Sequence, residues 1–355
     1  MNILVIGPSW VGDMMMSHAL YQQLKVQYPD CQIDVMAPDW CRPLLTRMPE
    51  VHKAISMPIG HGAFRLAERY RLGKLLRNQY DLAIVLPNSF KSALIPFFAK
   101  IPVRRGWKGE FRYGLLNDLR TNKEQYGKMV ERYVALAYDK DHKFPIGGNV
   151  SGIMTPMPYL KLDEQEIAQT KVKFADLLKS ESGRSVFGFC PGAEFGPAKR
   201  WPHYHYAKLA EILINEGKVV RIFGSKKDEK VGERIIQSLP EELRPYCVNL
   251  AGKTDLNEVV DLIAGCDMVI SNDSGLMHIA AALFRPLIAL YGPTSPKYTP
   301  PLSPFASVIR LIKGDLIKVR KGDGADGYHQ SLIDITPEMV LERIKGFRDS
   351  FRRIG

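Results

Sequence analysis

The chain has 355 residues, long enough for two globular domains, and its hydrophobic content of 45% can fill a core in each. No apolar run approaches the roughly 20 residues that span a bilayer. Met1–Gly7 has the character of a first strand, not of a signal peptide. Five scattered cysteines fit reduced thiols better than a disulfide framework or a zinc site, so we expect a cytoplasmic protein.

The net charge of +11 indicates an acidic partner. Between Lys91 and Arg132, ten Lys or Arg residues stand against four Asp or Glu, and between Arg343 and Gly355 five stand against one. Nucleic acid, an anionic membrane and a phosphorylated substrate are the partners that this charge favours. For either run of basic residues, the alternative is a solvated surface that binds no partner.

Strand and helix signals alternate along nearly the whole chain. This alternation predicts the α/β class, with parallel sheets that carry helices on both faces. The expected strands are 2–7, 32–37, 81–86, 186–190, 218–223, 267–271 and 287–291, and the expected helices include 14–27, 63–78, 126–138, 203–215, 227–238 and 255–265.

The stretch 139–160 is rich in Pro and Gly and breaks this alternation, which predicts a connection between two doubly wound domains. We expect an N-terminal domain over 1–160, a C-terminal domain over 161–335 and a last helix over 336–355 that packs back toward the N-terminal domain. A ligand cleft between the domains is expected, with the polar loop 313–331 over it.

The segment Asn272–Leu283 follows an apolar strand and precedes small and apolar residues at helical spacing. Asp273 or Ser274 is the expected N-cap of that helix. A strand, turn and helix in this order aim backbone N–H groups and the positive helix end at a crevice that suits a diphosphate. A plain capped helix is the alternative, and His278 is either a packed residue or a phosphate donor.

Two more turns follow predicted strands, and a third segment resembles part of a phosphate-binding loop. In Gly192–Pro202 the glycines permit close backbone approach, and Lys199 offers a cation to a leaving diphosphate. Asp228 either holds sugar hydroxyls or stabilises the start of its own helix. Thr254 ends a triplet that resembles the end of a phosphate-binding loop, although a cysteine stands where that loop needs its first glycine.

The turn Gly7–Met14 has the glycine spacing of a phosphate-binding loop, but Asp13 and Met14 stand where Lys and Ser or Thr belong. A carboxylate repels phosphate, so this turn does not bind a nucleotide in that way. Asp13 begins a helix at the carboxyl edge of the first strand, where it either caps the helix or takes a proton from an attacking hydroxyl.

Five motifs together resemble the bacterial lipopolysaccharide heptosyltransferases over residues 1 to about 340. The motifs are Gly-Pro-Ser-Trp-Val-Gly-Asp-Met (7–14), Pro-Asn-Ser-Phe-Lys-Ser-Ala (87–93), Pro-Gly-Ala-Glu-Phe-Gly-Pro-Ala-Lys-Arg-Trp-Pro (191–202), Asn-Asp-Ser-Gly-Leu-Met-His (272–278) and Leu-Tyr-Gly-Pro-Thr-Ser-Pro (290–296). The resemblance implies a GT-B architecture, in which two Rossmann-like domains face each other across a cleft. It also implies inverting transfer of heptose from ADP-heptose to a heptose of the lipopolysaccharide inner core.

The resemblance also implies roles for individual residues. Asp13 matches the general base. The implied donor-binding residues are Gly192, Ala193, Lys199, Asp228, Thr254, Asp273, Ser274, Gly275 and His278. The implied acceptor-binding residues in the basic N-terminal segment are Lys91, Arg104, Arg105 and Lys108, with Arg112 beside them.

We expect neither a metal site nor a tightly bound cofactor, with stimulation by Mg²⁺ left open. The expected partners are ADP-heptose, a lipid-linked inner-core acceptor and the anionic cytoplasmic face of the inner membrane, where the protein acts as a monomer without nucleic acid. Two alternatives remain: a sugar-nucleotide epimerase on the same fold, and a nucleic-acid binder suggested by the charge.

Overall fold

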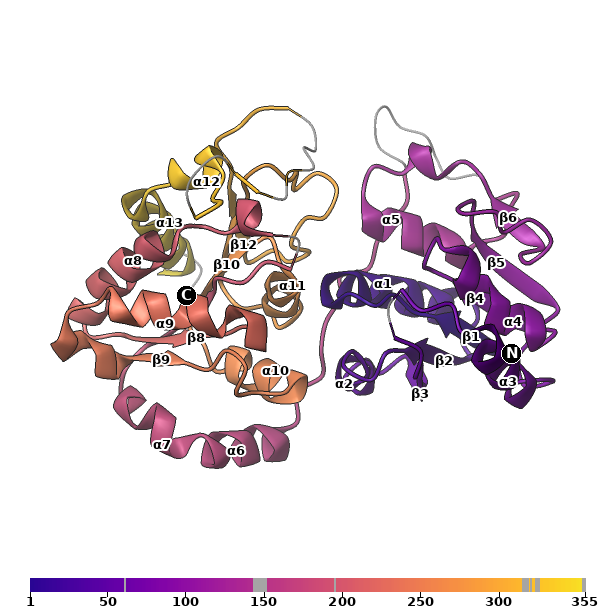
Figure 1. Cartoon of the computed structure of the whole chain (residues 1–355), viewed down its shortest axis with the longest axis horizontal. Helices are drawn as coiled ribbons and strands as arrows, with labels where there is room; N and C mark the ends of the chain where they lie inside the picture. The colour runs from indigo at the N-terminus through magenta and orange to yellow at the C-terminus, as the bar shows by residue number, and fades with distance from the viewer. Residues whose placement is uncertain are drawn as a thin grey trace. The chain divides into compact units, whose positions relative to one another are not determined.

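The computed structural model of the protein describes residues 1–60, 62–142, 152–194, 196–314, 319, 321–322 and 326–352. The chain divides into two compact units, Met1–Lys161 and Leu162–Gly355 (Figure 1). Each unit contains one parallel sheet whose central strands are buried on both faces. The predicted α/β class with two Rossmann-like sheets is confirmed.

The first unit has the strand order β3-β2-β1-β4-β5-β6, which is the order of Rossmann-type sheets. β1 lies at the centre, with Ile3 opposite Ile33 on one side and Leu82 on the other. The strands are β1 (Asn2–Ile6), β2 (Gln32–Ala37), β3 (Val51–Ser56), β4 (Leu82–Val85), β5 (Val103–Trp107) and β6 (Asp118–Arg120), and the α-helices are α1 (Val11–Gln27), α2 (Arg42–Thr46), α3 (Leu66–Leu75), α4 (Leu94–Phe98) and α5 (Met129–Val134).

The second unit repeats this topology, with the order β12-β11-β10-β7-β8-β9. Its central strands β7 and β10 are adjacent and parallel. The strands are β7 (Val186–Cys190), β8 (Val219–Ile222), β9 (Cys247–Asn249), β10 (Met268–Asn272), β11 (Leu287–Leu290) and β12 (Ala306–Ile309), and the α-helices are α6 (Glu164–Lys173), α7 (Ala175–Leu178), α8 (His203–Asn215), α9 (Glu229–Gln237), α10 (Leu256–Ala264), α11 (Gly275–Ala282), α12 (Gln330–Ile333) and α13 (Pro337–Arg352).

All seven predicted strands are confirmed, and five others were missed for physical reasons. β6 and β9 have three residues each, too few to show a periodic pattern. β3 and β12 lie at sheet edges and are only partly buried, so their sequences mix polar and apolar residues. β5 contains two arginines, and one of them, Arg105, is buried.

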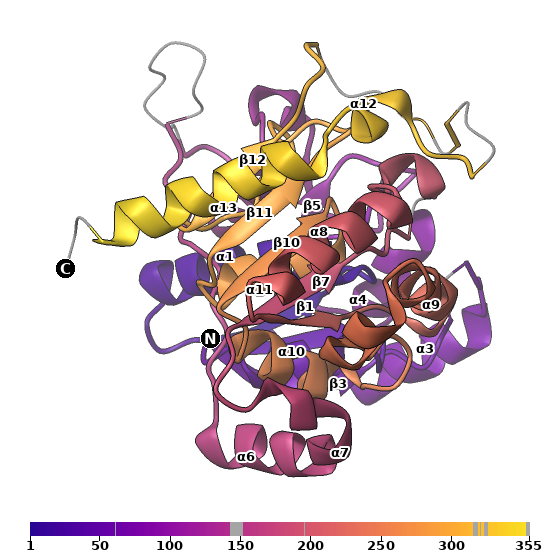
Figure 2. The ribbon, with the colours of Figure 1, turned by 90° about the vertical axis from the view of Figure 1, so that its left-hand side faces the viewer.

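The C-terminal helix packs on the second unit. α13 contacts α8 and β11, and Val340 and Ile344 are buried in the core of the second unit. Figure 2 shows α13 crossing the sheet beside α8. The apolar face of the helix thus completes the core of its own unit, and its expected packing toward the N-terminal domain stays a prediction.

Part of the predicted loop 313–331 lies outside the described residues, and α12 begins at its end. Among the residues that the structure describes, no helix is both long enough and apolar enough to cross a membrane.

Candidate active site

The second unit offers a ligand crevice at the carboxyl edge of its sheet. β7 and β10 are neighbours, and the connections that follow them run toward opposite edges of the sheet. Open α/β sheets bind ligands at such a point. The turn after β7 carries Gly192, Ala193 and Lys199, and the turn after β10 carries Asp273 and Ser274. The fold therefore brings these predicted residues to one edge of one sheet.

An ion pair joins the two turns. Lys199 Nζ lies 2.6 Å from Asp273 Oδ2, and Thr294 Oγ1, from the turn after β11, donates to the same oxygen at 2.7 Å. Asp273 is buried, whereas the Lys199 side chain keeps 18% of its surface exposed. The charged hydrogen bond fixes the ammonium group in one place at the crevice, where it can meet a diphosphate.

Helix α11 begins beside this ion pair. Ser274 is its N-cap, in an extended conformation and without a side-chain hydrogen bond to the first turn, and Gly275 is the first helical residue. The first-turn N–H groups have no partners within the helix and carry its positive end. Of the two predicted N-caps, Ser274 is confirmed, because the Asp273 carboxylate binds Lys199 instead.

His278 is buried one turn further along α11. Burial lowers the pKa of His278 from 6.5 to about 4, with the Asp273 carboxylate opposing the shift and the Lys199 ammonium adding to it. The imidazole is therefore neutral near pH 7 and presents one donor and one acceptor nitrogen.

Asp228, in the turn after β8, is held by residues of two turns. Arg200 Nη2 lies 3.1 Å from Asp228 Oδ1, and Ser225 donates to Oδ2 from its backbone N (3.0 Å) and from Oγ (2.7 Å). A Cβ on Gly192 would lie 2.6 Å from Asp228 Oδ2, so only glycine permits this approach. Arg200 also donates to the Ala193 carbonyl at 3.5 Å.

Asn272, the last residue of β10, ties the same turns together and was not predicted. Its Oδ1 accepts from Trp201 N (3.0 Å) and Tyr206 OH (3.2 Å), and its Nδ2 donates to Pro191 O (2.7 Å). All of these groups are buried, so the amide of Asn272 fixes the turn after β7 against the end of β10. Thr254 follows β9, two strands away from β7, and its hydroxyl donates to a carbonyl of its own turn.

Asp13 lies in the first turn of α1, directly after β1. It is half-buried, at the carboxyl edge of the sheet of the first unit. The pKa of the neighbouring Cys41 rises to about 12, mainly through burial and also through the negative charge of Asp13. Cys41 Sγ donates to Ser9 O at 3.5 Å, so the carboxylate and the turn after β1 share one neighbourhood.

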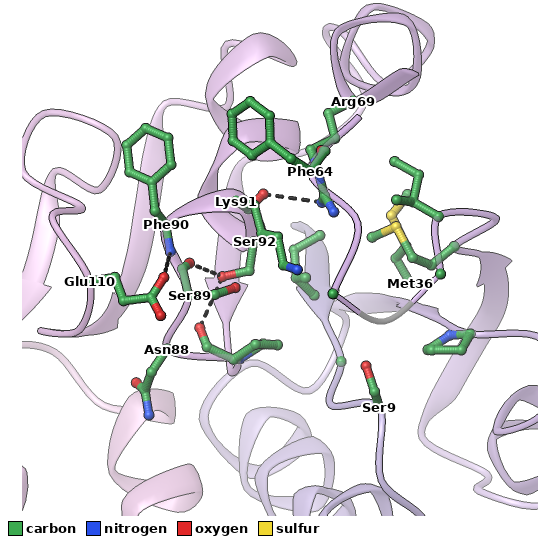
Figure 3. Close-up of a pocket in the computed structure, with 18 residues that line it drawn as sticks. Ser9, Met36, Phe64, Arg69, Asn88, Ser89, Phe90, Lys91, Ser92 and Glu110 are labelled. Atoms are coloured by element: carbon green, nitrogen blue, oxygen red, sulfur yellow. Dashed lines mark hydrogen bonds between the residues drawn. The ribbon is translucent and has the colours of Figure 1, made fainter. Parts of the chain in front are cut away.

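A cavity of about 550 Å³ lies at this edge of the first unit (Figure 3). The turns after β1 and β4 line it, which is the ligand position in a sheet of this strand order. Its lining combines small polar, aromatic and charged side chains. The lining residues are Ile6, Gly7, Ser9, Met36, Pro38, Met57, Ile59, Gly60, Gly62, Phe64, Arg69, Pro87, Asn88, Ser89, Phe90, Lys91, Ser92 and Glu110.

The predicted basic acceptor residues do not form one patch. Lys91 lines the cavity and Lys108 is exposed. Arg105 is buried, with Nε 2.6 Å from Asp118 Oδ2 and Nη2 3.0 Å from Asp139 Oδ1. A buried guanidinium needs such partners, and these bind it within the unit. The expected role of Arg105 in acceptor binding stays a prediction.

The guanidinium groups of Arg104 and Arg112 also donate hydrogen bonds within the first unit. Arg104 donates to Leu115 O (2.7 Å) and Ile101 O (2.6 Å), and burial lowers its pKa. Arg112 donates to Pro87 O (2.6 Å) and is almost completely buried, and burial lowers its pKa to about 10. These arginines therefore hold backbone segments in place.

Among the described residues, no group of three or more His, Cys, Asp or Glu side chains could hold a metal ion. The positive groups at the crevice of the second unit are the Lys199 ammonium, the Arg200 guanidinium and the N-terminus of α11.

Both units are Rossmann-like. The second has a cation beside a helix N-terminus, and the first has a carboxylate beside a cavity. These features define a two-domain α/β enzyme of the GT-B fold class. The sequence profile of glycosyltransferase family 9 (heptosyltransferase) matches residues 69–329. The chain belongs to this family and is a glycosyltransferase, which confirms the resemblance found in its motifs.

Similar proteins cover almost the whole chain. Lipooligosaccharide heptosyltransferase 2 of Haemophilus influenzae is 70% identical over 344 residues, which are 97% of this chain and 98% of that protein. Lipopolysaccharide heptosyltransferase 2 of Escherichia coli K12 is 61% identical over 348 residues, 97% of each chain. The solved structure of E. coli ADP-heptose LPS heptosyltransferase II matches with a TM-score of 0.87 at 56% identity and covers 98% of both chains.

Sequence reasoning missed Asn272, Thr294 and most of the cavity lining. Thr294 had a signal, because the polar turn Gly292–Ser295 follows the predicted strand 287–291 and must lie at the same sheet edge as Asp273. Part of the cavity lining had a signal, because the motifs 7–14 and 87–93 contribute to it. The other lining residues had none, since the whole lining comes from segments spread over more than a hundred residues.

Proposed function

We propose that this glycosyltransferase moves heptose from ADP-heptose to a heptose of the lipopolysaccharide inner core. Two relatives with more than 60% identity over 97% of this chain are named lipooligosaccharide and lipopolysaccharide heptosyltransferase 2. The similar solved structure is named for ADP-heptose. These names support the donor and the acceptor class of the proposed reaction.

The observation that carries the proposal is the Lys199–Asp273 ion pair beside the N-terminus of α11. In the proposed reaction the diphosphate of ADP-heptose binds there, and its charge grows as the bond to the sugar breaks. A fixed ammonium and oriented N–H groups stabilise that charge more in the transition state than in the ground state. Asp228 and His278 belong to the same donor site in this proposal.

Asp13 is the general base of the proposed mechanism. Its carboxylate takes the proton from the acceptor hydroxyl, and the oxygen attacks the anomeric carbon of the donor heptose. The bond between that carbon and the diphosphate oxygen breaks, and ADP leaves with the electron pair. One direct displacement inverts the configuration at the anomeric carbon.

We propose that the reaction needs no tightly bound cofactor or metal. Lys199 and the helix N-terminus would supply the positive charge that a bound metal supplies in other diphosphate sites. Free Mg²⁺ would still pair with the diphosphate, and its stimulation of the rate would then be modest.

The lipid-linked acceptor implies that the protein acts at the cytoplasmic face of the inner membrane. We propose a monomer that makes peripheral contact with anionic lipid through exposed lysines such as Lys108, each worth about 1 kcal/mol near such a surface. Arg105 and Arg112 have no part in this contact because they are buried.

Family membership favours transfer over epimerisation of the sugar nucleotide. The proposed substrates are themselves anionic, so the positive charge of the chain needs no nucleic-acid partner to explain it.

The test is incubation with ADP-heptose, with and without a deacylated acceptor that ends in heptose. We expect ADP release and a new glycosidic bond only when the acceptor is present, with the anomeric configuration opposite to that of the donor by NMR. A new sugar formed without acceptor would support the epimerase instead, and retained configuration would contradict direct displacement.

A further inference from the structure

Hydrogen bonds join the ends of four neighbouring strands in the second unit. The sheet order places β12, β11, β10 and β7 side by side. Arg310 directly follows β12, and Thr294 lies in the turn after β11. Asp273 directly follows β10, and Lys199 lies in the turn after β7. Thr294 therefore links the edge of the sheet to the ion pair at the crevice.

The side chain of Thr294 shares its acceptor with Lys199. Both donate to Oδ2 of Asp273, from the hydroxyl oxygen at 2.7 Å and from the ammonium nitrogen at 2.6 Å. Thr294 is 9% exposed and Asp273 is 8% exposed, so water has little access to this oxygen. A buried carboxylate needs hydrogen-bond donors. The hydroxyl supplies one that does not depend on the ammonium.

Two contacts fix the turn that carries Thr294. Arg310 Nε donates to Thr294 O at 2.9 Å, and Arg310 Nη1 donates to Ile312 O at 2.8 Å. In addition, a Cβ on Gly292 would lie 2.7 Å from Leu332 Cγ, because α12 packs closely on this turn. The backbone of the turn is thus held in place before any ligand binds.

The proposed reaction increases the negative charge that Lys199 faces. An ammonium has three N–H groups, so it can contact Asp273 and a phosphate oxygen together. When the bond to the sugar breaks, the terminal phosphate gains negative charge and attracts the ammonium more strongly. A buried carboxylate that loses part of its bond to the ammonium is destabilised unless another donor remains. Thr294 provides that donor.

We propose that Thr294 is a positioning residue of the diphosphate site, because it holds Asp273 so that the Lys199 ammonium can meet the growing charge of the diphosphate. This inference rests on the proposed function, which places the diphosphate of the donor beside Lys199. The hydroxyl should then matter most for the transition state and for bound ADP, whose terminal phosphate carries the charge that the sugar masks in the donor. It should matter least for the bound sugar nucleotide.

The test replaces Thr294 by Val, which keeps the shape of the side chain and removes the hydroxyl. We expect kcat to fall about tenfold and the dissociation constant of ADP to rise about tenfold. The KM for the sugar nucleotide should change by less than about twofold, because the site would lose little ground-state binding. Thr294→Ser keeps the hydroxyl and should keep most of the turnover and the affinity for ADP.

Thr170→Val is the matched control. Thr170 Oγ1 donates to Asp261 Oδ2 at 2.8 Å and both residues are buried, but they lie within α6 and α10 and not in a turn at the carboxyl edge. Both valine variants should have a lower melting temperature, whereas only Thr294→Val should change kcat and ADP binding. Equal kinetic effects of the two variants, or full turnover and normal ADP binding by Thr294→Val, would overturn the assignment.

A double-mutant cycle with Lys199→Ala tests whether Thr294 acts through the ammonium. Once the ammonium is absent, removal of the hydroxyl should change the dissociation constant of ADP by less than about twofold. If the effects of the two substitutions multiply instead, Thr294 acts on ADP by another route and the inference is wrong.

Calorimetry with ADP separates this inference from the proposed function, because it requires no transfer. If the cycle shows the expected coupling but the wild-type protein transfers no heptose, the role of Thr294 at the diphosphate site holds and the proposed reaction is wrong. If the wild-type protein transfers heptose while Thr294→Val keeps its kcat and its affinity for ADP, the inference is wrong and the reaction stands.

Discussion

At the scale of single residues, the role of each carboxylate in the site depends on the groups that it binds. Asp273 accepts from both Lys199 and Thr294, so it positions a cation. Asp228 accepts from Arg200 and Ser225, so it braces two turns. Asp13 is half-buried in the first turn of α1, at the carboxyl edge of the sheet of the first unit.

Replacing Asp13 by Asn should lower kcat by a factor of about 10²–10⁴, because proton transfer from the acceptor hydroxyl loses its base. The affinity for ADP should stay unchanged, since we place the donor in the second unit. Steady-state kinetics and calorimetry measure the two effects. Glu338→Gln, also in the first turn of a helix, is the control, and full turnover by Asp13→Asn would remove Asp13 from its role.

The lowered pKa of His278 predicts that the free energy of unfolding depends on pH. The pKa of His278 falls from 6.5 to about 4 on folding, so the unfolded chain binds more protons between these pH values. The free energy of unfolding should therefore be highest above pH 6.5 and fall by about 3 kcal/mol as the pH drops to 4. Urea unfolding of His278→Gln should show a flatter dependence over this range, and an equal slope would contradict the burial argument.

At the scale of elements, the segment that leads to the second unit is fastened to α1. Tyr159 N donates to His18 Nδ1 (3.2 Å), and its hydroxyl donates to Glu50 Oε1 (3.1 Å). His18 Nε2 lies 2.6 Å from the other oxygen of Glu50. The helix that carries Asp13 therefore also anchors the end of the first unit, and both features depend on the same packing of α1.

Replacing Tyr159 by Phe should lower the free energy of unfolding by about 1 kcal/mol, because Glu50 loses a hydrogen bond while the ring remains. Denaturant unfolding measures this effect, with the exposed Tyr70→Phe as the control. If the two variants lose the same stability, the hydroxyl of Tyr159 does not fasten this segment.

At the scale of the whole molecule, the chain repeats one topology in two compact units, and each has its own sheet. The second unit contains all of the proposed donor residues and its own core, including the apolar face of α13.

A protein comprising residues 162–355 should therefore fold and bind ADP by itself. We expect ADP to raise its melting temperature, because ligand that binds only the folded state stabilises it. The Lys199→Ala version of this fragment should show a smaller rise, since the diphosphate loses its cation. A fragment that folds but does not respond to ADP would contradict the location of the donor site.

Local pattern was enough to predict much of the fold and several of the residues that meet at the crevice of the second unit. Strands followed by glycine-containing turns and helices identified the edges where Lys199, Asp273 and Asp13 lie, because carboxyl ends of parallel strands share one edge. The role of a charged residue was harder to predict. Arg105 is buried because Asp118 and Asp139 bind it, and no spacing within its own strand reveals those partners.

The sequence by itself determined the α/β class, the order of turns along the chain and membership of a glycosyltransferase family, since these depend on local periodicity and on contiguous motifs. Only the tertiary structure decided which arginines are buried, which core α13 completes and where the first unit has a cavity. Each of those depends on contacts between segments far apart in the chain, and a contact of that kind exists only after folding brings the segments together.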